Sequence, residues 1–264
     1  MKAIVTWSGG KDGYTAYHKA TEQGHEVAYL LTIVYVEPYF FHSLRVAELG
    51  SKALEIPQLR IESKDPKNMY QDIFEALSRV KKEEGVEALV TGDVDAADHK
   101  RAWDDMCSKL GMKLITPLWD LPPYSGNRYR ERILNMELST GMKAIINCVD
   151  QKYLGEEWVG RIFDRACVQE MKALVGPPGV GIDATGEFGE FHTTVLDSPL
   201  FKKSIEITKF SKKKTVWGRR EGDPRGARGL GDAQIRMGLP PSGNFVYMDI
   251  EEAVLKPKNR KTTP

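Results

Sequence analysis

The sequence has few cysteines and lacks a long apolar segment. Its three cysteines (Cys107, Cys148 and Cys167) lie far apart, so they form neither a disulfide framework nor a CxxC metal or redox pair. The longest apolar stretch, residues 27–36, is interrupted by Thr32 and is far too short to span a bilayer. The amino terminus lacks the apolar core and small-residue cleavage site of a secretory signal. We therefore expect a soluble, cytoplasmic protein that does not associate with membranes.

Charge is balanced overall but unevenly distributed. The 264 residues carry a net charge of +1, yet residues 201–264 hold 15 Lys and Arg against 7 Asp and Glu. A basic final quarter can face an acidic partner or nucleic acid, or it can simply keep the surface solvated. Short runs such as Lys212-Lys213-Lys214 are typical of a solvated surface, so we do not expect nucleic acid as a partner.

The first half of the chain alternates short apolar runs with amphipathic patterns. This alternation predicts an α/β fold, with a parallel sheet covered by helices on both faces. In the helix expected over 68–84, Asn68 is a candidate amino-terminal cap. The expected strands are Ala3–Thr6, Val27–Val34, Leu59–Glu62, Ala88–Thr91 and Lys113–Thr116, and the expected helices are Tyr14–Gln23, Ser43–Leu54, Asn68–Glu84 and Asp98–Leu110.

The pattern changes near residue 116, where we place a domain boundary. The division is residues 1–116, then a smaller α/β domain over 117–257, then a basic tail over 258–264. In the second part the apolar spacing predicts one amphipathic helix over Glu157–Leu174, which would bury Cys167 as a core residue rather than as a nucleophile. The remaining expectations are a helix over Arg128–Gly141, strands over Lys143–Val149, Thr193–Leu196, Ile205–Phe210 and Asn244–Ile250, and a mobile loop over Glu221–Gly243.

The strongest local signal is the loop Ser8-Gly9-Gly10-Lys11-Asp12-Gly13, between the first strand and the first helix. Glycines there allow main-chain N–H groups to point at an anion, and the helix amino terminus adds the positive end of its dipole. Lys11 would supply a positive charge to phosphate. Asp12 would repel a bare phosphate, so its presence indicates a Mg²⁺ ion between them. The alternative is an ordinary glycine turn capped by Ser8 and Asp12.

Other candidate ligand-binding residues follow from the geometry of parallel sheets, where ligands lie beyond the carboxyl ends of the strands. Thr32 lies towards the end of the second strand, and Gly92-Asp93 follows the fourth. Gly92 would allow close backbone approach, while Asp93 would bind a metal or a ribose, or cap the next helix. Arg101 would reach phosphate from that helix or lie on its solvated face.

The loop resembles the SGGxDS pyrophosphate-binding loop of the N-type ATP pyrophosphatases, with Gly13 at the position of the usual serine. Gly13 removes a hydroxyl group but leaves the backbone donors in place. Residues 154–161 look like the LxxxWLGR segment of one branch, with Val159 in place of leucine. Residues 186–193 are similar to its GExGE[FY][EH]T signature, and residues 195–201 match the VLDxPLF continuation. That branch is the diphthine–ammonia ligase family, and the resemblance covers about three quarters of the chain.

The resemblance implies a Rossmann-like, HUP-type domain that binds ATP and Mg²⁺ over 1–116, followed by a substrate domain. It also implies that ATP is cleaved between its α and β phosphates. An acceptor carboxylate (diphthine on elongation factor 2) would be adenylated and then amidated by ammonia. Two other interpretations stay open: the same chemistry on a small carboxylic acid or a transfer RNA base, and a nucleotide-binding module without turnover. A homodimer is compatible with the sequence but does not follow from it.

Glu187, Glu190 and His192 are the further catalytic candidates, beside Lys11 and Asp12. A carboxylate pair there would hold an ammonium ion, accept its proton, or attract a trimethylammonium group. His192 would share proton transfer near neutral pH. The alternative is that both carboxylates brace the loop through backbone N–H groups.

Overall fold

The computed structural model describes residues 1–34, 41–63, 68–119, 127–175, 182–187, 189–217 and 243–258. Residues 221–242 of the loop expected over Glu221–Gly243, and residues 259–264 of the expected tail, lie outside these ranges, whereas Gly243 begins a strand. Lys258, which would begin that tail, binds Asp197 at 2.6 Å.

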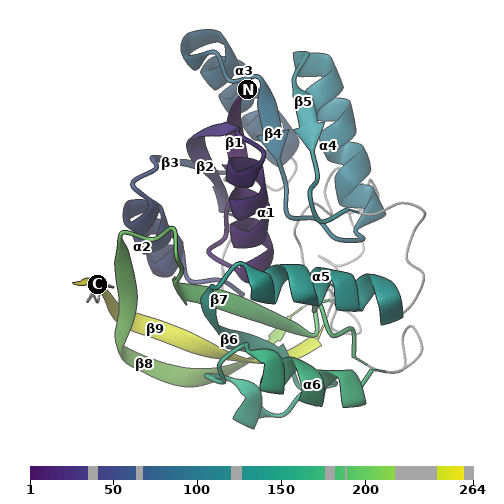
Figure 1. Cartoon of the computed structure of the whole chain (residues 1–264), viewed down its shortest axis with the longest axis vertical. Coiled ribbons are helices and arrows are strands. Elements are labelled where there is room, and N and C mark those ends of the chain that lie inside the picture. Colours follow the sequence, from purple (N-terminus) through teal and green to yellow (C-terminus); the bar gives the residue numbers. More distant parts are fainter. Residues whose placement is uncertain are drawn as a thin grey trace, which may run out of the picture.

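The first half forms a parallel sheet in the strand order β3-β2-β1-β4-β5, as predicted. Helices cover both of its faces (Figure 1). Ala3 and Val5 point into the cluster that contains α1 and α2, whereas Ile4 between them joins the cluster of α3 and α4. This alternation is the period of two that a strand buried on both faces requires. The elements are β1 (Lys2–Thr6), α1 (Lys11–Glu22), β2 (Glu26–Val34), α2 (Leu44–Leu54), β3 (Gln58–Glu62), α3 (Met69–Glu84), β4 (Ala88–Val90), α4 (Ala97–Leu110) and β5 (Lys113–Ile115).

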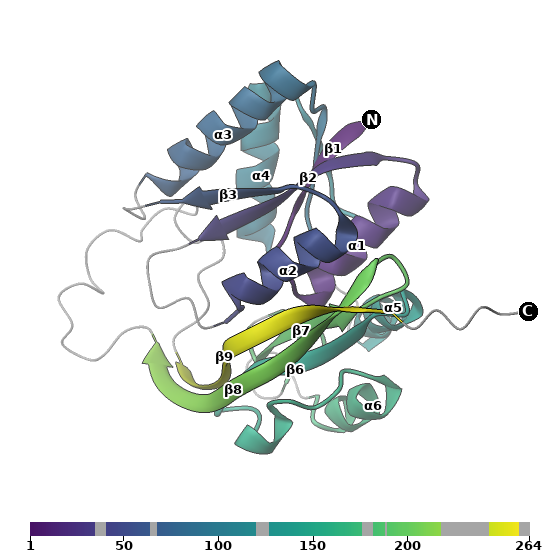
Figure 2. The same cartoon turned by 90° about the vertical axis from the view of Figure 1, so that its left-hand side faces the viewer.

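The second half forms an antiparallel sheet in the order β7-β6-β9-β8. Helix α2 packs against β7, β8 and β9, while α1 contacts β7 and α5. Helices α1 and α2 therefore lie between the two sheets, and α6 lies on the far side of the second sheet (Figure 2). The elements are α5 (Asn127–Ser139), β6 (Lys143–Asp150), η1 (Glu156–Trp158), α6 (Arg165–Ala173), β7 (Phe191–Asp197), β8 (Lys203–Trp217) and β9 (Gly243–Pro257).

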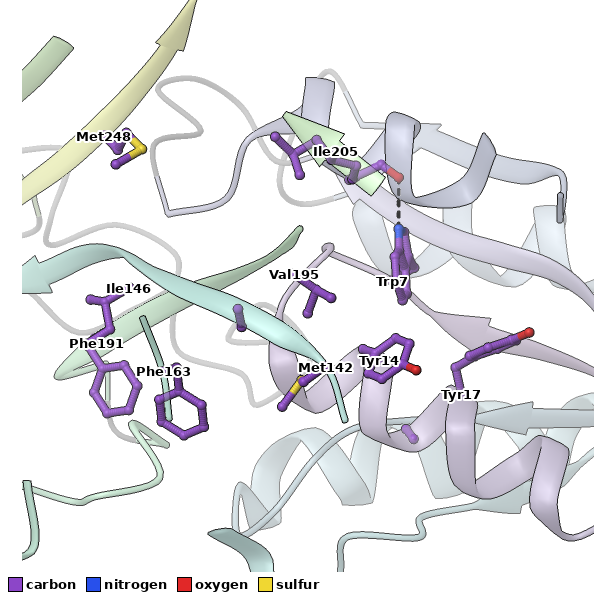
Figure 3. Packing of buried hydrophobic residues seen from close by; sticks show 14 of the residues in the cluster. Trp7, Tyr14, Tyr17, Met142, Ile146, Phe163, Phe191, Val195, Ile205 and Met248 are labelled. Carbon is purple, nitrogen blue, oxygen red and sulfur yellow. Dashed lines mark hydrogen bonds between the residues drawn. The ribbon is translucent and has the colours of Figure 1, made fainter. Parts of the chain in front are cut away.

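One hydrophobic cluster runs through both sheets. It joins Trp7 and Tyr14 near the phosphate loop to Phe163, Phe191 and Val195 in the second half (Figure 3). The Trp7 Nε1 donates to the Ala47 carbonyl at 2.9 Å, which satisfies the polar atom of this buried ring. The two sheets thus share one core.

The single helix expected over 157–174 is wrong. Gly160 adopts φ +96°, and Ile162 forms a bridge to Ile145 with 61% of its surface exposed, so the segment leaves the helical path. Asp164 then begins α6 by accepting from the Cys167 N–H at 2.9 Å. Apolar spacing alone did not reveal this break, because Trp158, Val159 and Phe163 are buried without sharing one helix.

Other boundaries differ less. Asn68 occupies the amino-terminal cap of α3 but makes no capping hydrogen bond through its side chain. Strands β8 and β9 each run for 15 residues, far beyond the apolar segments that predicted them. The residues of β8 beyond the expected apolar segment are mostly polar, and most of their side chains face solvent.

Candidate functional site

The phosphate loop lies at the switch point of the first sheet. Strand order reverses between β1 and β4, and the crevice beyond the carboxyl ends of two such strands is where this class of sheet binds ligands. Gly92, directly after β4, touches the loop: a Cβ there would lie 2.8 Å from the carbonyl carbon of Asp12. Gly92 thus permits close backbone approach, as predicted, and the backbone it approaches is the first turn of α1.

Strand β7 of the second half is hydrogen-bonded to the same loop. Gly9 has φ +81°, and its carbonyl accepts from the Val195 N–H at 2.8 Å. The Lys11 N–H donates to the Thr193 Oγ1 at 3.0 Å, although we expected this N–H to face an anion. The Gly10 N–H lies 3.4 Å from the Ser8 Oγ. The two sequence signatures, 182 residues apart at this bond, therefore build a single site.

Lys11 is buried, with 2% of its surface exposed. Its Nζ donates to the Asp12 Oδ1 at 2.6 Å and to the Glu137 Oε1 at 2.9 Å. Burial lowers the pKa of Lys11, but Asp12 and Glu137 outweigh that effect and leave it raised. The ammonium group is therefore charged and is held between two carboxylates.

Sequence reasoning missed Glu137. It is fully buried, and burial raises the pKa of its carboxyl well above the usual value even though Lys11 opposes the shift. Its Oε2 has no hydrogen-bond partner among the described residues. A signal was present: Glu137 lies three and four residues after the buried Leu134 and Ile133, on the apolar face of α5.

Glu187 belongs to the second half of the chain, but its side chain lies at the amino end of α4. Its Oε1 accepts from the backbone N–H groups of Val94, Asp95 and Ala96 at 3.3, 3.1 and 3.2 Å. Burial, followed by the charges of Asp12 and Asp93, raises the pKa of Glu187 to about 8. A carboxyl that titrates near neutral pH beside two other acids can exchange a proton there.

Asp93 adds another acidic group. Its Oδ1 lies 3.2 Å from the His99 Nδ1, and its buried Oδ2 has no partner within the described part of the chain. Unpaired buried carboxylate oxygens on Asp93 and Glu137, close to Asp12 and Glu187, leave negative charge that Lys11 alone does not balance.

Mg²⁺ fits this excess of negative charge. Asp12 would hold the ion, because its side chain is 36% exposed and borders the glycine loop. Among the described residues, no three His, Cys, Asp or Glu side chains are grouped as ligands of one metal ion. Mg²⁺ is commonly bound through one or two carboxylates together with water and substrate phosphates, so a single protein ligand agrees with that pattern.

Glu190 does not share the location of Glu187. Its buried Oε1 accepts from the Asp183 N–H at 2.9 Å, which braces the turn before β7. Glu187 and Glu190 therefore serve different backbone segments, although the sequence suggested one carboxylate pair.

Thr32 and Arg101 are already engaged by protein groups. The buried Thr32 hydroxyl donates to the Trp7 carbonyl at 2.7 Å and accepts from the Gln58 Nε2 at 2.7 Å. Arg101 is 69% exposed and pairs with Asp98 on the outside of α4. Of the predicted ligand-binding set, the loop, Gly92 and Asp93 converge at the crevice.

His192 lies beside a residue that the sequence reading overlooked, His42. The two imidazole rings meet edge to face, with centroids 5.1 Å apart. Burial lowers the pKa of His42 to about 4 although Asp12 opposes the shift, and burial and then His42 lower the pKa of His192 well below its usual value. Both rings are therefore neutral at pH 7.

Arg161, from the motif over 154–161, and two buried cysteines have structural roles. Arg161 donates to both oxygens of Glu170, at 2.9 and 2.7 Å, and its guanidinium lies 4.1 Å from the centre of the Trp158 ring. Cys167 is buried as predicted, and burial raises the pKa of its thiol to about 11. Cys148 pairs in register with His192, but burial raises the pKa of its thiol too far for a nucleophile.

Within the described ranges, no helix is long and apolar enough to cross a membrane.

Comparison with known proteins agrees with the sequence signatures. Family models match twice: "Diphthamide synthase N-terminal domain" over residues 1–114 and "Diphthamide synthase C-terminal domain" over residues 130–223. Diphthine–ammonia ligase of Homo sapiens is 24% identical over 231 residues, which cover 78% of this chain and 83% of the relative. The ligase of Bos taurus is 26% identical over 232 residues, with the same coverage.

Two other matches are more limited. Diphthine–ammonia ligase of Schizosaccharomyces pombe is 26% identical over 229 residues, which cover 79% of this chain and 36% of the relative. A solved structure described as a predicted subunit of tRNA methyltransferase from Methanocaldococcus jannaschii matches with a TM-score of 0.35 and 18% identity, covering 75% of this chain and 99% of that one. The two family models together cover most of the sequence, and the chain therefore belongs to the diphthamide synthase family.

Proposed function

We propose that this protein is an ATP-dependent ligase that adenylates a carboxylate and converts it to an amide with ammonia. The acceptor we propose is diphthine on elongation factor 2, in line with the names of the relatives. The observation that carries the proposal is the joining of strand β7 to the Ser8–Gly13 loop at the switch point, with Glu187 bound to the amino end of α4. A nucleotide-binding module without turnover would not need a cluster of carboxylates there.

In the first step, an oxygen of the acceptor carboxylate attacks the α-phosphorus of ATP. The bond from that phosphorus to the bridging oxygen breaks, and pyrophosphate leaves with the electron pair. The protein would orient the phosphates with backbone donors of the glycine loop, while Asp12 holds Mg²⁺. When bound, the ion would supply positive charge that offsets the negative charge of the leaving pyrophosphate. Lys11, which is buried in the loop beside Asp12, would add positive charge from the protein.

In the second step, ammonia attacks the acyl carbon and AMP leaves. At pH 7 ammonia is present chiefly as ammonium, which must lose a proton before it can attack. Glu187 is placed for this transfer because it lies beside Asp12 at the loop and its pKa is about 8. Glu190 is the second proposed carboxylate; its role would be to hold the turn that carries Glu187.

The test incubates the protein with ATP, ammonium and diphthine-bearing elongation factor 2. We expect one amide per modified histidine, seen as a loss of about 1 Da in the peptide mass, together with equal amounts of AMP and pyrophosphate. ADP and orthophosphate as products would contradict adenylation. AMP formation with small carboxylic acids or transfer RNA, but not with elongation factor 2, would keep the mechanism and replace the acceptor.

A further inference from the structure

The Lys11 ammonium is enclosed by the protein core, although the sequence predicts that it contacts phosphate. Only 2% of Lys11 is exposed, and its Nζ lies 5.9 Å from the centre of the Phe163 ring and 5.9 Å from that of the Phe191 ring. The two rings lie side by side in the cluster that joins both sheets (Figure 3). Asp12, by contrast, has 36% of its side chain exposed. The exposed charge is therefore the carboxylate of Asp12, and the ammonium is withdrawn from solvent.

Both ends of Lys11 are fixed by hydrogen bonds. Its N–H donates to the Thr193 Oγ1 at 3.0 Å, and its carbonyl accepts from the Thr15 Oγ1 at 2.8 Å. At the other end, Nζ donates to the Asp12 Oδ1 at 2.6 Å and to the Glu137 Oε1 at 2.9 Å. A side chain bound at both ends keeps one conformation, and it thereby sets the position of the carboxylate that it contacts.

Glu137 is the rigid end of this series of contacts. Its side chain is fully buried on α5, and the Thr140 Oγ1 donates to its carbonyl at 2.7 Å. Asp12 also lies close enough to the Glu137 carboxyl for the two groups to form a hydrogen bond. Lys11 and Glu137 together therefore determine where the Asp12 carboxylate lies.

We propose that Lys11 and Glu137 are positioning residues, which orient the Asp12 carboxylate for Mg²⁺. The inference rests on the proposed function, because it needs Mg²⁺ and ATP at this loop. Lys11 holds Oδ1, and the ion would bind through Oδ2. Carboxylates that bind metal ions are commonly held by hydrogen bonds of this kind, and the loss of such a partner weakens metal binding about 10- to 100-fold. Lys11 would then act on the phosphates through Asp12 rather than by direct contact.

The test measures binding of α,β-methylene-ATP by calorimetry, once with Mg²⁺ and once with EDTA. This analogue cannot be cleaved between its α and β phosphates, so binding is measured without turnover. The quantity compared is the factor by which Mg²⁺ strengthens binding. The variants are Lys11→Met, Glu137→Ala and Glu137→Gln, of which the last keeps an oxygen acceptor for Lys11. Glu131→Gln, which changes an exposed acid on the same helix, is the matched control.

Stability is measured on the same preparations. Thermal unfolding shows whether each variant is folded at the assay temperature. The double variant Lys11→Met/Glu137→Gln removes the buried ion pair as a unit, and it replaces either single variant that does not fold.

We expect the factor from Mg²⁺ to fall at least about 10-fold in Lys11→Met and in Glu137→Ala, with a smaller fall in Glu137→Gln. Binding in EDTA should stay close to that of the parent in all three. Lys11→Met and Glu137→Ala change the local charge in opposite directions. A loss of the Mg²⁺ effect in both therefore reports the orientation of Asp12 and not the net charge.

An unchanged effect of Mg²⁺ in these folded variants would overturn the inference and leave the proposed function intact. A loss of about 10- to 100-fold for Lys11→Met in EDTA would also overturn it, because Lys11 would then hydrogen-bond a phosphate directly. A parent protein that binds the analogue equally well with and without Mg²⁺ would overturn the inference alone. A parent that binds it under neither condition would overturn both the inference and the proposed function.

Discussion

At the scale of single residues, the main feature of the site is that acidic side chains outnumber basic ones. One buried ammonium, that of Lys11, faces Asp12 and Glu137 directly, while Asp93 adds a further acidic group and Glu187 titrates near pH 8. In a medium of low polarity these charges shift one another's pKa values strongly. Each side chain can be tested separately, because each makes different contacts.

Asp12→Asn keeps the shape of the side chain but removes the charge that would hold Mg²⁺. Because the side chain is partly exposed, we expect a folded variant whose turnover falls by at least about 100-fold. The measurement is the rate of AMP formation at saturating Mg²⁺. Asp98→Asn, which changes an exposed acid in the first turn of α4, is the control and should leave the rate unchanged. An unaltered rate in Asp12→Asn would restrict Asp12 to pairing with Lys11.

Glu137→Ala removes a fully buried carboxylate from Lys11 and should lower the free energy of unfolding by about 3–5 kcal/mol. Glu131→Ala on the same helix removes an exposed partner of Lys172 and should cost less than about 1 kcal/mol. Urea denaturation of the two variants compares them directly. Similar losses in both would show that Lys11 is satisfied by Asp12 alone.

Glu187 should make stability depend on pH. Its pKa is about 8 in the folded protein and about 4.3 in an unfolded chain, so between these values the folded state binds more protons. The free energy of unfolding should therefore fall as the pH rises from about 5 to 8, by a few kcal/mol at most. Glu187→Gln removes this group, and its curve of stability against pH should be flatter than that of the parent. Parallel curves would show that Glu187 is ionised throughout this range.

Sequence patterns revealed some of these residues and not others. Ser8–Gly13 was predicted because glycines, a cation and a carboxylate coincide between a strand and a helix. Glu137 and His42 reach the same site through tertiary packing, and neither belongs to a local motif of recognised spacing. Their proximity in sequence suggested that Glu187 and Glu190 form one carboxylate pair. In the structure, the two carboxylates accept hydrogen bonds from different backbone segments.

At the scale of elements, short apolar runs predicted the parallel strands closely, because strands buried on both faces are apolar throughout. The lengths of the long, exposed strands were underestimated, because β8 and β9 are held together by 14 paired positions rather than by apolar side chains. The break between η1 and α6 escaped detection because a helical spacing of apolar residues does not report the positive φ of Gly160.

The contact between β4 and α1 gives a prediction at this scale. A Cβ at position 92 would press on the backbone of Asp12 and Gly13 at 2.8–3.0 Å, so Gly92→Ala must shift the first turn of α1. We expect a loss of about 1–3 kcal/mol in unfolding free energy, together with weaker ATP binding. Gly13→Ala is the matched control: the tightest contact of its Cβ would be with the Thr6 carbonyl oxygen, at 3.1 Å, and smaller losses should follow. Equal effects of the two changes would mean that the turn adjusts freely.

At the scale of the whole molecule, α1 and α2 are covered by sheets on both sides. The division into 1–116 and 117–257 therefore separates sequence segments whose apolar residues form one cluster. The N-terminal family model, which ends at 114, contains α1 and α2, whereas the C-terminal model, which begins at 130, contains β7 and β8, on which these helices pack. The domain division itself stays a prediction.

A fragment of residues 1–116 tests that division. It would expose the apolar faces of α2 and α1 that pack on β7, β8 and β9, so we expect aggregation or a poorly dispersed NMR spectrum. The complete chain should instead unfold in one cooperative transition. A monomeric fragment with dispersed signals and reversible unfolding would show that the first sheet is independently stable.

The hydrogen bonds between β7 and the glycine loop also limit when the site can form during synthesis of the protein. The loop leaves the ribosome before β7, and Thr193 and Val195 follow more than 180 residues after it. At about 5–20 residues per second, this interval is on the order of 10–40 seconds. Until then the nascent protein carries the glycine loop without the contacts that hold it. The proposed nucleotide site is thus completed only after β7 has been made.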